Sequence, residues 1–83
     1  MDPAEIKGRL REFICTDLLG RPDYPLDDRE PLITGGLIDS FSLARVGAFA
    51  EQAFQADVAD ADLSAENMDT VDAMVRTILK ARG

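Results

Sequence analysis

The sequence predicts an all-α fold, a small four-helix bundle with three main helices, a short third helix and a long loop between the first two helices. Three observations lead to this prediction. Apolar residues recur at helical spacing in three segments, proline and glycine cluster in one stretch, and no segment alternates apolar with polar residues as a half-buried strand does. Eighty-three residues support one core of limited size. We therefore expect residues 1–83 to form a single domain and a monomer.

The first helix is expected over residues 3–19. Asp2 is a good cap, Pro3 suits the first helical position, and Glu5 can reach back to the free backbone amides. Gly20 is a natural end for the helix. The apolar stripe that defines its buried face comprises Ile6, Leu10, Phe13, Ile14 and Leu18.

Residues 20–39 are expected to form a loop, because they contain three prolines and a glycine pair that a helix does not tolerate. A loop of this length is unusual in so small a domain and suggests a function. Three apolar residues are expected to attach it to the core, namely Leu26, Leu32 and Ile33.

The second helix is expected to begin at Asp39 or Ser40, with Asp39 as the candidate cap, and to end near Phe54. Its buried face comprises Leu43, Val46, Ala50, Ala53 and Phe54. A short third helix is expected near residues 63–67, opened by Asp62 or Ser64.

The last helix shows the clearest periodicity, and Asp69 is its candidate cap. Its apolar stripe comprises Val71, Met74, Val75, Ile78 and Leu79. Asp72 near its start, with Arg76 and Lys80 towards its end, suits the helix dipole.

Composition excludes several classes of function. A net charge of −7 argues against a nucleic-acid partner, whose phosphates require Lys and Arg. Histidine is absent, which removes the commonest general base and the Ser-His and Cys-His nucleophiles, so we do not expect an enzyme. Metal sites require several Cys or His together, and the single cysteine, Cys15, is expected to be a small packing residue. No apolar run approaches the roughly 20 residues that span a bilayer and no signal-peptide pattern opens the chain, so we expect a cytoplasmic protein without a membrane span.

The acidic charge is concentrated in the middle of the chain. Between Asp23 and Asp72, twelve acidic residues stand against only Arg29 and Arg45. Such a segment can steer basic partners electrostatically, or it can simply keep the surface soluble.

The most informative stretch for function runs from Gly36 to Leu43, with the sequence Gly-Leu-Ile-Asp-Ser-Phe-Ser-Leu. Asp39 and Ser40 suit the capping positions of a helix without any further role. However, a long loop delivers Ser40 to a helix amino terminus, where backbone amides and the helix dipole favour a phosphate ester. Because the chain has no base to activate a nucleophile, any chemistry on Ser40 requires another enzyme.

This stretch resembles the attachment motif of the acyl carrier protein superfamily. The resemblance extends over the whole chain, through the capped first helix, the long loop, the helix after Ser40 and the ending Glu66-Asn67-Met68-Asp69-Thr70-Val71. It implies that Ser40 takes 4′-phosphopantetheine from coenzyme A. Asp39 would support attachment, either by coordinating the transferase's magnesium or by holding the helix start. Ser42 is the rival hydroxyl.

The resemblance also implies a partner face and a set of partners. The partner-recognition residues are expected to be Phe41, Ala44, Arg45 and Ala48. The partners would be a phosphopantetheinyl transferase, which adds the arm, and enzymes that load or use the acyl group, either an acyl- or aminoacyl-activating ligase or synthase and transferase enzymes.

The chain departs from carriers of primary fatty acid synthesis, which usually have acidic residues two and five positions after the serine. Ser42 and Arg45 stand at those positions here. This departure indicates a specialised carrier. Such a carrier would be loaded by its own activating ligase, or it would serve a polyketide or peptide pathway. The alternative function is a non-catalytic acidic helical module that only binds another protein.

Small residues on the second helix bear on the cargo. In the family that this chain resembles, the acyl chain can fold back between the helices, and Gly47, Ala50 and Ala53 are small enough to leave space. Because protein interiors rarely contain real voids, we expect Phe13, Phe49 and Phe54 to fill that space. The cargo is then expected to be short or exposed.

Overall fold

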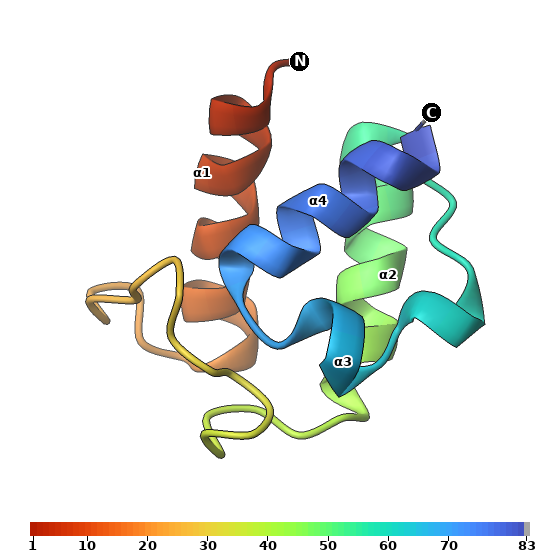
Figure 1. The fold of residues 1–83 in the computed structure, drawn as a ribbon. Coiled ribbons are helices and arrows are strands. Elements are labelled where there is room, and N and C mark those ends of the chain that lie inside the picture. The colour runs from red at the N-terminus through yellow and green to blue at the C-terminus, as the bar shows by residue number, and fades with distance from the viewer. Residues whose placement is uncertain (83) are drawn as a thin grey trace.

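In the computed structural model, which describes residues 1–82, every regular element is helical (Figure 1). The order along the chain is α1 (Pro3–Phe13), a π-helical turn η1 (Ile14–Leu18), α2 (Ser42–Phe54), a 3-10 turn η2 (Asp60–Asp62), α3 (Ala65–Met68) and α4 (Val71–Arg82). The described residues contain no strand, and the predicted all-α class of small helical bundle is confirmed.

Helix α1 begins as predicted and ends differently. The Asp2 carboxylate accepts a hydrogen bond of 2.8 Å from the Glu5 amide, so the predicted cap is confirmed. The sequence predicts one helix to residue 19, whereas α1 ends at Phe13 and continues as η1. The Leu19 amide donates to the Ile14 carbonyl at 2.9 Å, five residues back, which widens the last turn. Gly20, with a φ of +65°, then turns the chain into the loop.

The loop between η1 and α2 is attached to the core by its apolar residues. Leu26 and Leu32 are only 2% and 0% exposed, and Ile33 packs against the core from a half-buried position. Their predicted role in holding the loop is therefore confirmed. The other buried side chains come from all four helices, from η1 and from the segments before and after α2, and they form one hydrophobic cluster with Leu26 and Leu32.

Charged side chains tie the loop to both terminal helices. The Lys7 ammonium group lies 3.1 Å from Asp28 in the loop and 2.9 Å from Asp72 in α4. Arg11 pairs with Asp28 at 3.4 Å and donates to the Leu26 carbonyl at 2.6 Å. Lys7, Asp28 and Asp72 are about one-third exposed and Arg11 is 41% exposed. Together these side chains join three segments that are far apart in the sequence.

Helix α2 begins at Ser42, later than the predicted start at Asp39 or Ser40, because residues 39–41 form a turn of tighter hydrogen bonds. It ends at Phe54, as predicted, and Gln55 follows in the left-handed conformation with a φ of 56°. The predicted buried face is confirmed for Leu43, Val46, Ala50 and Phe54, with Ala53 half-buried.

The third helix lies slightly later than predicted and the last helix has a different cap. Ser64 precedes α3, and its carbonyl accepts from the Met68 amide at 2.8 Å. The prediction that Asp69 caps α4 is wrong, because the Thr70 hydroxyl accepts from the Ala73 amide at 3.0 Å instead. The Asp69 carboxylate is directed to the loop, as described below.

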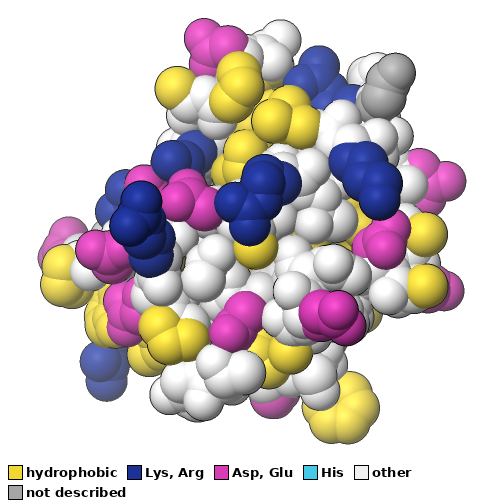
Figure 2. All heavy atoms as spheres, in the orientation of Figure 1, with side chains coloured by type: hydrophobic (Ala, Val, Ile, Leu, Met, Phe, Trp, Pro, Cys, Tyr) yellow, Lys and Arg dark blue, Asp and Glu magenta, His cyan; other side chains and the backbone are white. Residues whose placement is uncertain are grey.

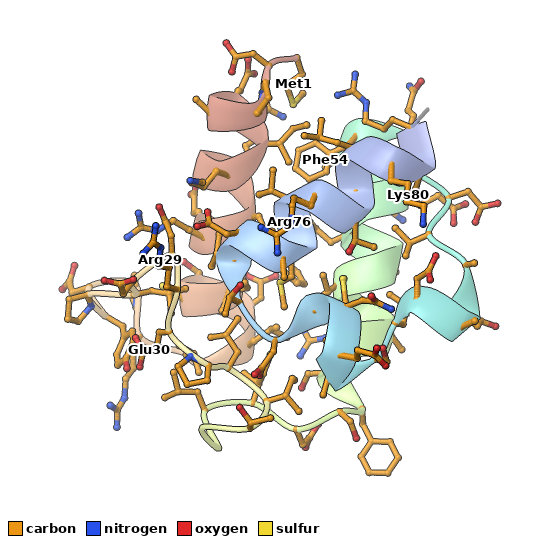
Figure 3. All side chains as sticks on the ribbon, in the orientation of Figure 1. Met1, Arg29, Glu30, Phe54, Arg76 and Lys80 are labelled. Carbon is orange, nitrogen blue, oxygen red and sulfur yellow. The ribbon has the colours of Figure 1, made fainter. Side chains whose placement is uncertain are left out.

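Helix α4 crosses in front of α1 and α2 in Figure 1, and Phe54 lies in the space between α1 and α4 in Figure 3. Arg76 and Lys80 project outward from α4 at separate points along the helix (Figure 3), and Figure 2 shows separate cationic groups on this face. No helix within residues 1–82 has both the length and the apolar character needed to cross a membrane.

Candidate functional site

Ser40 lies in the turn that leads into α2, and Asp39 organises this turn. The Asp39 carboxylate accepts hydrogen bonds from the Ser42 amide at 3.0 Å and from the Ser42 hydroxyl at 3.2 Å. The backbone closes on itself as well, since the Leu43 amide donates to the Ser40 carbonyl at 3.2 Å. Asp39 therefore acts as a cap, as predicted, although the helix itself starts at Ser42.

The two candidate hydroxyls have different environments. Ser40 is exposed, and its hydroxyl makes no hydrogen bond with any residue between 1 and 82. Ser42 is half-buried, and its hydroxyl is bonded to Asp39. A reacting enzyme would reach the Ser40 oxygen without breaking a protein hydrogen bond, whereas Ser42 would first have to leave its partner.

The backbone around Ser40 also suits an anion. The amides of Ser40 and Phe41 have no protein acceptor among the described residues. Unpaired amides at the amino end of a helix carry partial positive charge and are ready donors to a phosphate oxygen. The turn thus combines an exposed hydroxyl with free donors beside it.

Asp69 fixes the part of the loop that precedes Ser40. Its carboxylate accepts from the Ile33 amide at 2.8 Å, the Thr34 amide at 2.9 Å and the Thr34 hydroxyl at 2.7 Å. The Asp69 carbonyl also accepts from the Leu32 amide at 2.6 Å. We call this set of hydrogen bonds the Asp69 latch.

The Asp69 latch has an electrostatic signature. The hydrogen bonds from the Thr34 amide and hydroxyl and from the Ile33 amide hold the pKa of Asp69 below its ordinary value of 3.8. The loop then continues through Gly36, whose φ is +81°, and the Ile38 amide donates back to the Leu32 carbonyl at 3.0 Å. The latch and this turn therefore determine where the Asp39–Ser40 turn lies.

The residues predicted for partner recognition lie together on the exposed side of α2 and the turn before it. Phe41 is 86% exposed, which is unusual for a large apolar side chain. Ala44, Arg45 and Ala48 are also exposed, and the first turn of α2 contains no acidic residue. Arg45 makes no ion pair with another described residue. This surface is therefore apolar with a single positive charge.

Some acidic side chains of the central segment form ion pairs or hydrogen bonds within the fold. Four of its acidic side chains bind other parts of the protein, namely Asp28, Glu30, Asp69 and Asp72. The exposed ones that follow the start of α2 are Glu51, Asp57, Asp60 and Glu66. A negative field at the partner face would therefore come from beyond Ala48 and not from the first turns of α2.

An open groove lies between α1 with η1 on one side and α2 on the other. Its floor contains Phe13 and Phe49, whose rings stack with centroids 4.3 Å apart and an angle of 11° between their planes. We call it the α1–α2 groove. Its lining residues are Arg9, Glu12, Phe13, Thr16, Asp17, Arg45, Ala48, Phe49, Gln52 and Ala53.

The opposite side of α2 is filled. A Cβ atom added to Gly47 would lie 3.0 Å from the Leu63 side chain, so the two are already in close contact. Phe49 contacts Phe54 edge-on with centroids 5.5 Å apart. The three phenylalanines therefore pack against one another, as predicted, whereas the side chain that lies against Gly47 is Leu63 and not a phenylalanine.

Cys15 is buried, at 6% exposure, as expected for a packing residue. Burial raises the pKa of its thiol, and the sulfur lies 3.8 Å from the Tyr24 carbonyl. Within residues 1–82 there is no cluster of three or more side chains suited to hold a metal ion.

Sequence reasoning missed the Asp69 latch and the α1–α2 groove. The true cap of α4 had a local signal, because Thr70 immediately precedes the apolar stripe and is as good a capping residue as its neighbour. The latch had none, since its partners are 35 and 36 residues away.

Comparisons with models of known protein families, with curated proteins and with solved structures found no match for this chain. The residues of the chain itself therefore carry the functional inference.

Proposed function

We propose that this protein is an acyl carrier protein, built on the four-helix arrangement of that superfamily, in which Ser40 carries 4′-phosphopantetheine. The observation that carries the proposal is the Ser40 hydroxyl, which is exposed and, within residues 1–82, makes no hydrogen bond and lies next to unpaired amides at the start of α2. The resemblance of the Gly36–Leu43 stretch to the carrier attachment motif supports the same residue.

The attachment reaction assigns clear roles to this chain's residues. The Ser40 oxygen forms a bond to the pantetheine-bearing phosphorus of coenzyme A, the pyrophosphate bond breaks, and 3′,5′-adenosine bisphosphate leaves. The hydroxyl proton passes to a base of the transferase, because the chain has no histidine to take it. Asp39 holds the turn by binding Ser42, which leaves Ser40 directed to solvent.

Once attached, the arm supplies a terminal thiol that holds an acyl or aminoacyl group as a thioester. The protein contributes positioning and partner selection, and it performs no catalysis itself. A flexible tether raises the effective concentration of the acyl group at each partner enzyme. We propose that Phe41, Ala44, Arg45 and Ala48 form the surface that these enzymes contact, including the transferase and the loading ligase or synthase.

The test is the intact mass of the protein after incubation with coenzyme A and a broad-specificity phosphopantetheinyl transferase. We expect the wild type and Ser42→Ala to gain one phosphopantetheine mass, and Ser40→Ala to gain none. Circular dichroism of Ser40→Ala should match the wild type, because the hydroxyl makes no hydrogen bond within the described fold.

Two results would contradict the proposal. Full modification of Ser40→Ala together with loss in Ser42→Ala would move the site to Ser42. No mass gain in any protein, with a known carrier modified in the same reaction, would favour the acidic interaction module. The 86% exposure of Phe41 would then mark its binding surface.

A further inference from the structure

The α1–α2 groove lies within reach of Ser40. Its lining on α2 runs from Arg45 through Ala48 and Phe49 to Ala53. A helix rises 1.5 Å per residue, so Phe49 lies about 13 Å from Ser40 along the axis. The groove therefore begins little more than one helical turn beyond the proposed attachment site.

We propose that this groove binds the pantetheine arm of Ser40, with the phosphodiester beside Arg45 and a short acyl thioester near Ala53. The inference rests on the function proposed above. It adds a binding site for the arm and an upper limit on the length of the acyl chain. There are two alternatives. A protein partner could occupy the groove, or the arm could bind in the interior of the bundle, and the experiment below distinguishes both from the proposal.

The length of the arm matches the length of the groove. About fourteen bonds separate the serine oxygen from the sulfur, which gives an extended reach of roughly 16 Å at the span per bond of an extended chain. Along α2 that distance ends near residue 51, so about 5 Å of helix remain before Phe54. An acyl group of about four carbons would still contact the groove, and a longer one would extend past its end into water.

The charge at the near end of the groove suits the phosphodiester. Arg45 is exposed and has no ion-pair partner among residues 1–82. Side chains on a helix lean towards its amino terminus, which directs the Arg45 guanidinium group back towards Ser40. An ion pair with the phosphodiester would give this cation the partner that the described part of the chain does not provide.

The floor and rim of the groove suit the rest of the arm. The half-buried rings of Phe13 and Phe49 offer apolar surface to the methylene groups of the β-alanine and cysteamine units of the arm. Thr16, Asp17 and Gln52 on the rim offer hydrogen-bonding groups to the two amides of the arm. An apolar floor with a few polar groups around it is the usual composition of a small-molecule site.

The opposite face of α2 is closed to the arm. Leu63 already lies against Gly47, with 3.0 Å to the position that a Cβ atom would occupy, and Ala50 is fully buried. Entry there would require displacing packed core side chains, which protein interiors resist. The α1–α2 groove is open without any such change.

The experiment uses isotope-labelled protein loaded with ¹³C-labelled phosphopantetheine, and then with its butyryl thioester. Nuclear Overhauser effects should connect the methylene protons of the β-alanine and cysteamine units of the arm with the ring protons of Phe13 and Phe49. These methylene resonances should also move upfield relative to free pantetheine because of the ring currents.

Two matched variants locate the contact. Ala48→Leu fills the groove and should lose these Overhauser effects, whereas Ala61→Leu adds the same side chain to an exposed position outside both the groove and the proposed partner surface and should retain them. Both alanines are exposed, so neither substitution disturbs the core. Intact mass shows that each protein is completely loaded before the spectra are compared.

The outcomes separate this inference from the proposed function. Complete modification without contacts to Phe13 or Phe49 overturns the groove assignment and leaves the carrier function intact. Contacts to Leu63 in place of the two rings put the arm in the interior and also overturn it. Contacts unchanged in Ala48→Leu refute the location. Groove amides that shift only when a transferase is added make a protein partner the occupant, and absence of any mass gain removes both proposals together.

Discussion

Removal of the Asp69 carboxylate should destabilise the protein markedly, even though Asp69 caps no helix. In Asp69→Ala the amides of Ile33 and Thr34 and the Thr34 hydroxyl lose their acceptor. A hydrogen bond to a charged group contributes about 1.5–3 kcal/mol when buried and less when solvent competes for it. Because Thr34 is exposed and Ile33 half-buried, we expect a total loss of about 2 kcal/mol.

This loss is measurable by thermal unfolding. For a domain of this size, a loss of about 2 kcal/mol lowers the midpoint by roughly 8–16 °C. Amide hydrogen exchange at residues 32–34 should accelerate as well, since the loop loses its attachment. The matched control is Asp57→Ala, which removes an exposed carboxylate without a hydrogen-bond partner among residues 1–82 and should change stability by at most about 0.5 kcal/mol.

The pH dependence gives an independent check. The pKa of Asp69 is lowered from 3.8, so the folded state favours the charged carboxylate. The stability that this charge contributes is fully present above about pH 4 and is lost as the pH falls through the lowered pKa of the folded state. The difference in stability between the wild type and Asp69→Asn should therefore shrink in that acidic range. If Asp69→Ala unfolds at the same temperature as Asp57→Ala, the latch does not stabilise the loop.

Three further predictions concern the last helix, the partner face and the cargo. Thr70→Ala removes the cap of α4 and should lower the free energy of unfolding by about 1 kcal/mol. Ser64→Ala should lower it less, because the Ser64 hydroxyl accepts from no backbone amide within residues 1–82, and equal losses would contradict the capping assignment. Arg45→Glu should speed modification by a fatty-acid-type transferase at low salt, where charge effects are least screened, and an unchanged rate would show that Arg45 does not select partners. Thermal midpoints of acetyl-, hexanoyl- and decanoyl-loaded protein should stop rising after short chains; a steady climb would indicate a buried chain, since each buried methylene contributes roughly 0.8 kcal/mol.

Features that depend on neighbouring residues could be predicted from the sequence. The Asp2 cap, the apolar stripes of α1, α2 and α4, and the turn-forming residues of the loop all act within one or two helical turns. The exposed position of Ser40 belongs to this group, because Asp39 positions the turn through a residue only three places away. Local chemistry was therefore sufficient for the helices and for the candidate serine.

Features that depend on distant contacts could not be predicted. Asp69 and Thr70 are both good caps, and the choice between them was decided by loop amides about 35 residues away that bind Asp69. Phe13 and Phe49 were predicted to pack together, but the groove above them depends on how α1 and α2 are spaced. The π-helical turn η1 likewise arises where the chain leaves the helix, which the apolar stripe does not reveal.

The burial of Cys15 determines how the protein would respond to thiol reagents. Only a thiolate reacts readily with a maleimide or an aromatic disulfide, and the sole cysteine of the chain is both buried and shifted to a higher pKa. In a colorimetric thiol titration, the folded, unmodified protein should therefore show almost no reactive thiol. One thiol per chain should react only after denaturation. A carrier that holds the phosphopantetheine arm without an acyl group would add one fast-reacting thiol under native conditions. Fluorescent labels and crosslinkers could then be directed to the arm without replacing Cys15.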